Sequence, residues 1–161
     1  MSRARDLADF VIGSLTDLSL VNANITTTNT TDLNVVGLTS VSEISETLSN
    51  LILVSNSASP NFVDGGLFYI SASPTGNFTL DLQNVPTTDS KVLTISFIVV
   101  QGSTGYIPSV IRIGGSAQTI KWVGGSAPTP TSSSGKIDIF TFTLIRSSSS
   151  WQVLGSSTRN F

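Results

Sequence analysis

Apolar and polar residues alternate in short runs over the C-terminal two thirds of the chain. In residues 77–85 every second residue is apolar (Phe78, Leu80 and Leu82), and this period of two is typical of a half-buried strand. Residues 91–101 and 136–146 form longer and more apolar runs. The predicted strands cover residues 66–72, 77–85, 91–101, 106–113, 117–123, 136–146 and 150–154. Seven short strands separated by turn residues predict a mainly β protein, with an antiparallel, jelly-roll-like β-sandwich over residues 66–161.

Turn residues set the limits of these strands. The phrase Gly-Gly-Ser-Ala occurs twice, at residues 114–117 and 124–127, and we expect two turns that bound one strand between them. Pro108 lies inside another predicted strand. Because proline has no N–H to donate to a β-ladder, Pro108 predicts an edge or a bulge at that point.

The first thirteen residues predict a short anchor helix. Ser2 is a suitable cap and Gly13 a suitable stop. A helix of this length is not stable alone in water. We therefore expect residues 1–13 to dock on another protein through one basic and apolar surface, formed by Arg3, Arg5, Leu7, Phe10 and Val11.

Residues 14–54 predict an extended stem. Residues 14–40 combine few apolar residues with many Thr and Asn, which favours extended backbone; a disordered linker is the alternative. Residues 40–54 have a capping-box spacing (Ser40 and Glu43) and a short a/d pattern, which predict a short helix. Neither segment has a core of its own, so we expect three copies to share the stem. The predicted contacts are Leu33, Val35, Leu38, Val41, Ile44, Leu48 and Leu51; packing of the short helix on a neighbouring domain is the alternative.

Composition excludes several kinds of chemistry. The 161 residues include no Cys and no His, which removes thiol and imidazole catalysis, disulfides and the usual zinc sites. Net charge is −2, without the basic bias of a nucleic-acid-binding protein. No run approaches the roughly 18 apolar residues of a membrane span. We expect a protein that is not an enzyme and has no cofactor, metal, nucleic-acid partner or membrane-inserted segment.

The remaining candidates for chemistry are acids and aromatic rings. Asp81 and Asp138 occupy positions that the alternation predicts to face solvent, and no two acids are expected to converge as glycosidases require. Aromatic residues on a sandwich can present a sugar-binding surface. The candidates are Tyr69, Tyr106, Trp122 and Trp151, although the alternation predicts that both tryptophans point into the core.

Several phrases resemble known virion proteins. Residues 2–10 (SRARDLADF) resemble the start of fibre-like structural proteins of tailed phages, especially marine and cyanobacterial ones, and residues 31–39 (TDLNVVGLT) are similar to short repeats of trimeric phage-fibre shafts. Residues 118–128, 136–145 and 151–155 look like the C-terminal β-domain of such proteins. The resemblance implies a non-enzymatic homotrimer on the virion surface, anchored by its N-terminus to capsid or tail proteins.

The short stem qualifies this resemblance. It favours a stubby fibre or a capsid decoration (cement) protein over a long fibre. The alternative is a tail fibre or tail-fibre adaptor that attaches to the host through a tip that binds a carbohydrate or another receptor, in which case a host-surface glycan is a partner.

Overall fold

A computed structural model describes residues 45–161. The predicted anchor helix and most of the stem lie outside these residues. So do the five anchor residues and five of the seven predicted stem contacts: Arg3, Arg5, Leu7, Phe10, Val11, Leu33, Val35, Leu38, Val41 and Ile44. Leu48 and Leu51 are described.

The described residues form strands and two short 3-10 helices, η1 (Phe62–Asp64) and η2 (Val123–Gly125), without an α-helix. None of their helices has the length and hydropathy needed to cross a membrane. The strands in chain order are β1 (Leu48–Asn50), β2 (Ser57–Ala58), β3 (Leu67–Ile70), β4 (Phe78–Leu82), β5 (Lys91–Val100), β6 (Pro108–Ile113), β7 (Ser116–Gln118), β8 (Ile120–Trp122), β9 (Ile137–Ser147) and β10 (Ser150–Thr158).

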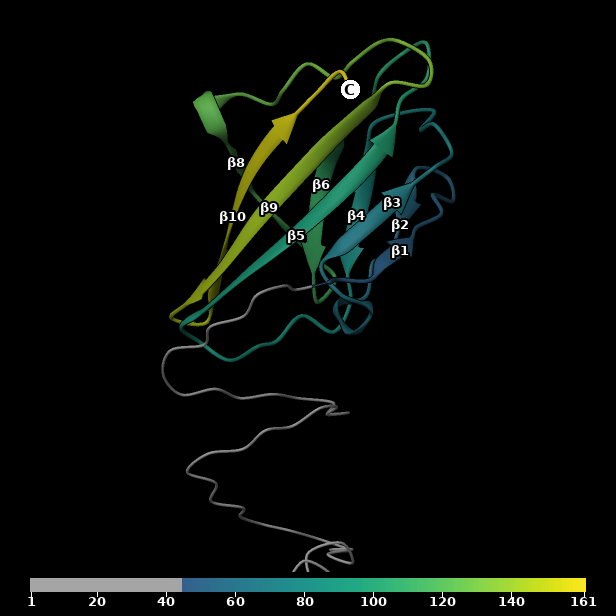
Figure 1. Ribbon diagram of the computed structural model, residues 1–161. Helices are drawn as coiled ribbons and strands as arrows, with labels where there is room; N and C mark the ends of the chain where they lie inside the picture. Colours follow the sequence, from purple (N-terminus) through teal and green to yellow (C-terminus); the bar gives the residue numbers. More distant parts are fainter. Residues whose placement is uncertain (1–44) are drawn as a thin grey trace, which may run out of the picture. The chain divides into compact units, whose positions relative to one another are not determined.

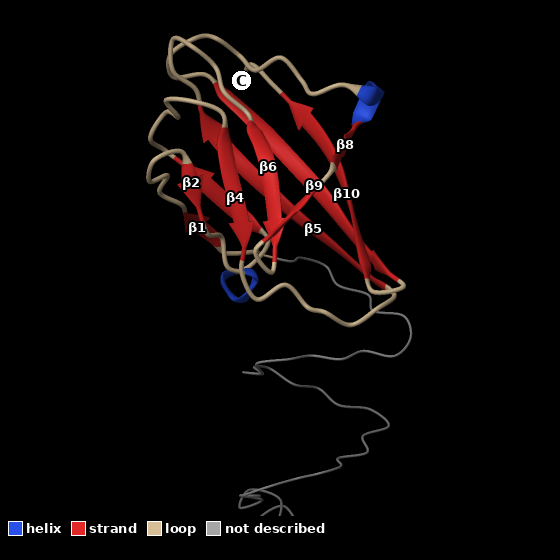
Figure 2. Ribbon diagram, turned by 180° about the vertical axis from the view of Figure 1, so that it is seen from behind, coloured by secondary structure: helices blue, strands red, loops and turns tan. Residues whose placement is uncertain are grey.

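The first six strands wind as a β-solenoid of about three turns (Figure 1). Each turn places one strand in a six-stranded sheet, sheet A, and the next in a four-stranded sheet, sheet B. Thus β1, β3 and β5 pair in parallel in sheet A, and β2, β4 and β6 pair in parallel in sheet B. Figure 2 shows sheet B in front of the long strands of sheet A.

The last four strands close the solenoid. Strand β7 turns back along β6, and β9 pairs with β5 in the antiparallel sense. Strand β10 forms a hairpin with β9, and β8 adds to its outer side in parallel. The order of sheet A is therefore β1-β3-β5-β9-β10-β8, and that of sheet B is β2-β4-β6-β7.

The predicted jelly-roll-like antiparallel sandwich is wrong. The domain is mainly β, as expected, but its first six strands alternate between two sheets and pair in parallel with the strand two places along the chain. The alternation of apolar residues sets which face of a strand is buried. It does not set strand direction, because parallel and antiparallel strands can bury the same alternating residues.

Most strand positions are confirmed. All seven predicted runs contain strands, although residues 117–123 are divided between β7 and β8, which lie in different sheets. Both Gly-Gly phrases lie at turns with positive φ. The predicted bulge is confirmed, since the β4–β6 register shifts between Phe78 and Thr79, opposite Pro108.

The predicted helix over residues 40–54 is wrong where it is described. Residues 48–50 form β1, which pairs with β3, and residues 57–58 form β2. The folded domain therefore includes residues 45–65, which the sequence assigned to the stem and to a boundary. Leu51 and Leu53 pack against the core from this segment. The a/d spacing was too short to outweigh tertiary pairing of the strand.

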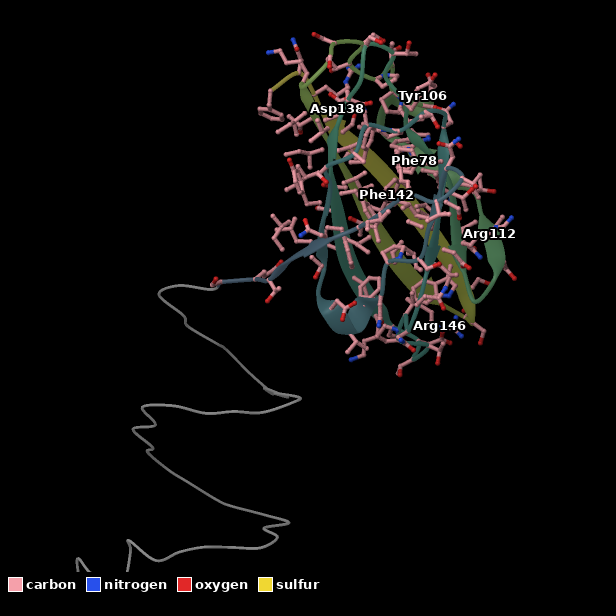
Figure 3. The ribbon with its side chains drawn as sticks, turned by 90° about the vertical axis from the view of Figure 1, so that its right-hand side faces the viewer. Phe78, Tyr106, Arg112, Asp138, Phe142 and Arg146 are labelled. Atoms are coloured by element: carbon pink, nitrogen blue, oxygen red, sulfur yellow. The ribbon has the colours of Figure 1, made fainter. Side chains whose placement is uncertain are left out.

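The core fills the space between the two sheets. Sheet A contributes stacked Phe68 and Phe97, whose ring centroids are 5.6 Å apart. The ring of Phe142 lies edge-on to Phe97 at 6.1 Å and to Trp122 at 5.5 Å. Figure 3 shows Phe142 among the side chains between the sheets, while Arg112 projects on the side of sheet B.

The hairpin between β9 and β10 has a strained turn that can be relieved. Ser148 and Ser149 are its two central residues, with φ of 49° and 59°. Both positions require the left-handed region, which Asn and Gly occupy at lower cost than Ser. We expect Ser148→Asn combined with Ser149→Gly to raise the free energy of unfolding by about 1 kcal/mol, measured by urea denaturation. Ser103→Gly, at a loop position without positive φ, is the control and is not expected to stabilise.

Candidate interaction surface

The outer face of sheet A lacks the polar character expected of a solvated sheet. In a sheet that is covered on one face only, the residues on the other face are normally polar. In β9 the inward residues Phe140, Phe142 and Leu144 are fully buried, yet the outward positions on the same strand include isoleucines. This strand is apolar on both faces, and only one of the faces is covered by the described residues.

The same character extends across the sheet. We use the name sheet A outer face for the outward strand positions, which follow from the register with β9. Its apolar members are Leu48, Leu67, Tyr69, Val92, Ile98, Val100, Ile137, Ile139, Ile145 and Leu154. The remaining members are Ser, Thr, Asn and Gln side chains with one exception, Lys121 on the edge strand β8. The sheet A outer face is therefore broad and almost uncharged, and about half of its members are apolar.

Two hydroxyl groups at its centre are hydrogen-bonded to each other. Ser96 and Thr141 are directly opposite in the β5–β9 ladder, and their hydroxyl oxygens are 3.0 Å apart. One row away, Tyr69, Ile98 and Ile139 are aligned across β3, β5 and β9. A hydroxyl pair that shares a hydrogen bond costs less to desolvate than two hydroxyls bonded only to water, which favours covering the centre of this face with an apolar partner.

A shallow hollow lies toward the β8 edge of the same face. It has a volume of about 430 Å³, and Leu154, Thr143 and Ser156 contribute to its lining. Beside it, the Lys121 ammonium donates a hydrogen bond to Gln152 Oε1 at 3.1 Å. The single charge of the sheet A outer face therefore already has a polar neighbour at the rim.

The outer face of sheet B has the opposite character. Its outward positions include Thr79, Asp81, Val110 and Arg112, and Asp81 is the register partner of Arg112. Arg112 is exposed, and the exposed Ser57 of β2 lies on the same face. Val110 is the exception, a half-buried apolar residue on this polar face. Sheet B is thus the solvated side of the domain, and the contrast singles out sheet A.

The two predicted contact residues that are described lie at the start of the solenoid. Leu48 is 48% exposed and belongs to the sheet A outer face, at its β1 edge. Leu51 is half-buried and packs against the core. Leu48 therefore remains a candidate contact between copies, whereas Leu51 is held by its own domain.

Asp138 is buried, contrary to its predicted outward position. Its carboxylate is 0% exposed and accepts four hydrogen bonds. Oδ2 accepts from Thr131 N at 2.8 Å and from Gln101 Nε2 at 3.1 Å; Oδ1 accepts from Thr131 Oγ1 at 2.6 Å and from Asn160 N at 3.1 Å. These bonds fasten the loop before β9, the end of β5 and the C-terminal segment together. Because its four hydrogen bonds all join segments of this domain, Asp138 has a structural role.

Asp89 also makes structural contacts within the domain. Asp89 pairs with Arg146, whose Nε is 3.2 Å from Oδ1, and accepts from Ser149 N, which fixes the β9–β10 turn. Asp138 and Arg146 lie near opposite ends of β9 (Figure 3). Residues 45–161 contain no group of three acids that could hold a metal ion.

The aromatic candidates for sugar binding are mostly engaged within the domain. Both tryptophans are half-buried and pack against the core, as the alternation predicted. Trp122 lies over Gly155, where an added Cβ would be 2.7 Å from Trp122 Cε3. The guanidinium carbon of Arg146 is 5.2 Å from the ring centre of Trp151. Tyr69 differs, because it points outward on the sheet A outer face.

The sequence contained an unused signal for this surface. Residues 137–145 carry isoleucine or threonine at the outward positions and Phe or Leu at most inward ones, so the run is apolar in both registers. A run of this kind is typical of a strand that is covered on both faces.

Comparison with known proteins gave no further guide to function. No protein-family model, no curated protein sequence and no solved structure matches the chain.

Proposed function

We propose that this protein is a non-enzymatic structural component of a bacteriophage virion, exposed on the particle surface as a short homotrimeric fibre or a capsid decoration protein. The sheet A outer face is the observation that carries the proposal. A domain with a large, nearly uncharged apolar face is built to be covered by another protein surface. The resemblance of residues 2–10 and 31–39 to phage fibre proteins supplies the setting.

The chemistry of the domain supports a structural role. The only fully buried acid in residues 45–161, Asp138, accepts four hydrogen bonds, and Asp89 holds a backbone N–H group and a guanidinium. These side chains stabilise loops at the two ends of β9. A chain without Cys and with one Met also resists oxidation outside a cell.

Attachment through the N-terminus is part of the proposal. Residues 1–13 supply a helix cap, two arginines and an apolar face, and three such segments in one trimer would bind a particle with avidity. Capsid or tail proteins are the proposed partners. The location on the virion surface follows from this arrangement, with the β-solenoid domain outermost.

The second candidate is a tail fibre or adaptor whose domain binds a host-surface glycan. The hollow beside Leu154 supports it, because Lys121 and Ser156 place polar groups next to an apolar floor. Trp122 also contributes to the lining of this hollow, but its ring packs edge-on to Phe142. Trp151 lies under the Arg146 guanidinium, so both rings leave less surface for a sugar to stack on.

A whole-particle reconstruction of the phage that encodes this chain tests the proposal. We expect density for the β-solenoid domain on the outside of the particle. Density on the shell favours decoration, and density restricted to the tail favours the fibre or adaptor. Purified virions that lack the protein would contradict both. Particles made without the gene, then incubated with the full chain or with a chain that begins at residue 14, test the anchor: only the full chain is expected to bind.

A further inference from the structure

We propose that the sheet A outer face is the surface through which copies of this chain pack against one another. The inference deepens the proposed function. It rests on that proposal for one point only, the number of copies, which is three. It adds the folded domain to an association that the sequence placed in the stem alone.

The first argument is charge. Symmetric copies bring identical residues close to the same axis, so a like-charged face would repel itself. The strand positions of the sheet A outer face carry one charge, Lys121, and it lies on the edge strand with its ammonium bonded to Gln152 Oε1. The centre of the face can therefore meet other copies without desolvating an ion.

The second argument concerns the hydrogen bonding of the polar groups at the centre of the face. Ser96 and Thr141, the hydroxyl residues nearest the middle of the face, are hydrogen-bonded to each other at 3.0 Å. Each hydroxyl therefore keeps one hydrogen-bond partner when the face is covered. Apolar residues of a second copy, such as Ile98 and Ile139, can pack over this pair at a lower desolvation cost than over two hydroxyls bonded only to water.

The third argument is size. Strands β5, β9 and β10 have 10, 11 and 9 residues, and β1, β3 and β8 have 3, 4 and 3. At a rise of about 3.3 Å per residue and a strand spacing of about 4.8 Å, these six strands present roughly 630 Å². Two such faces packed together bury roughly 1,300 Å², which is at the lower end of the range for specific interfaces. The face is thus large enough for association.

The polar face of sheet B provides an internal comparison. Asp81 and Arg112 are register partners there, and Thr79 and Ser57 share the same side. One chain therefore carries one sheet face with an acid and a base at its centre and one that is almost uncharged. Because the contrast is between faces, it is not a consequence of the low charge content of the whole chain.

The test is the oligomeric state of the full chain by light scattering and sedimentation velocity. Ile98 and Ile139 are register partners at the centre of the face, half-buried and pointing away from the core. We expect a trimer for the unchanged protein, and at least a 100-fold weaker association for the double variant Ile98→Glu, Ile139→Glu. Val110→Glu, a half-buried outward residue of sheet B, is the matched control and should remain a trimer.

A second measurement decides if the double variant does not fold. The chain has no Cys, so one introduced cysteine is the only thiol. Thr141→Cys is expected to form disulfide-linked pairs of chains on mild oxidation, whereas Ser109→Cys on the sheet B side is not. A folded double variant that stays a trimer would overturn the proposal, and so would equal cross-linking at the two positions or a monomeric unchanged protein. None of these results depends on where the protein lies on the particle, so the virion assignment is tested separately.

Discussion

Replacing Asp138 with alanine is expected to lower the free energy of unfolding by about 3–5 kcal/mol. The substitution removes the acceptor of four hydrogen bonds inside a site that is 0% exposed. Thr131 N and Asn160 N would lose this acceptor, and the Gln101 amide would keep only its bond to the Tyr106 carbonyl. Donors that are withdrawn from water and have no acceptor cost free energy. Urea denaturation at one fixed protein concentration measures the loss.

Two further substitutions make this prediction specific. Asp138→Asn keeps the size of the side chain but replaces one acceptor oxygen with a donor, so an intermediate loss is expected. Asp64→Ala is the control, because Asp64 is an exposed acid of η1, and its effect should stay within about 0.5 kcal/mol. Hydrogen exchange should rise around residue 131 and at the C-terminus in the Asp138 variants. A stability equal to that of the control would show that the four bonds contribute nothing net.

Truncation of Phe142 to alanine is expected to cost a similar amount, about 3–5 kcal/mol. Phe142 is fully buried between the sheets and touches aromatic rings on two sides, Phe97 and Trp122. A cavity there would weaken the packing of the β9–β10 hairpin against the core of the solenoid. The fluorescence of Trp122 should also change, since its ring is 5.5 Å from that of Phe142.

Phe161→Ala is the matched control for this truncation. Phe161 is 57% exposed, and its ordered contact with Ile137 is made by the backbone. Its removal should change stability by less than about 0.5 kcal/mol. If the two phenylalanine variants unfold at the same urea concentration, the core between the sheets is not organised around Phe142.

The strands were predictable from local sequence, but their connections were not. The alternation in residues 77–85 fixed which side chains of β4 are buried, and Pro108 marked the bulge in β6. The parallel pairing of β3 with β5 joins residues far apart in the chain, and each ladder position would accept the same apolar residues in an antiparallel sheet. Strand direction therefore depends on the path of the connections, which no short pattern records.

The burial of Asp138 and the sheet A outer face were missed in the sequence for related reasons. The alternation in residues 136–146 was recognised, but Asp138 was assigned to the outward face and lies on the inward one. The reason is that an aspartate is expected to be solvated unless donors from distant residues surround it. Those donors come from residues 101, 131 and 160, which only the fold brings together. The outward isoleucines of β9 were visible in the sequence, yet their meaning required a register that shows which face is already covered.

The position of β9 in sheet A affects how the chain must be synthesised. Strand β5 is the last of the three parallel strands of sheet A, and its edge away from β3 has no partner until β9 (Ile137–Ser147) has been made. Until then a long apolar strand, Lys91–Val100, presents free backbone groups to any other chain. Products that end before Ile137 should therefore aggregate. The hairpin of β9 and β10 has a two-residue turn and forms quickly once both strands exist, so synthesis of residues 137–158 is the step that covers the free edge of β5.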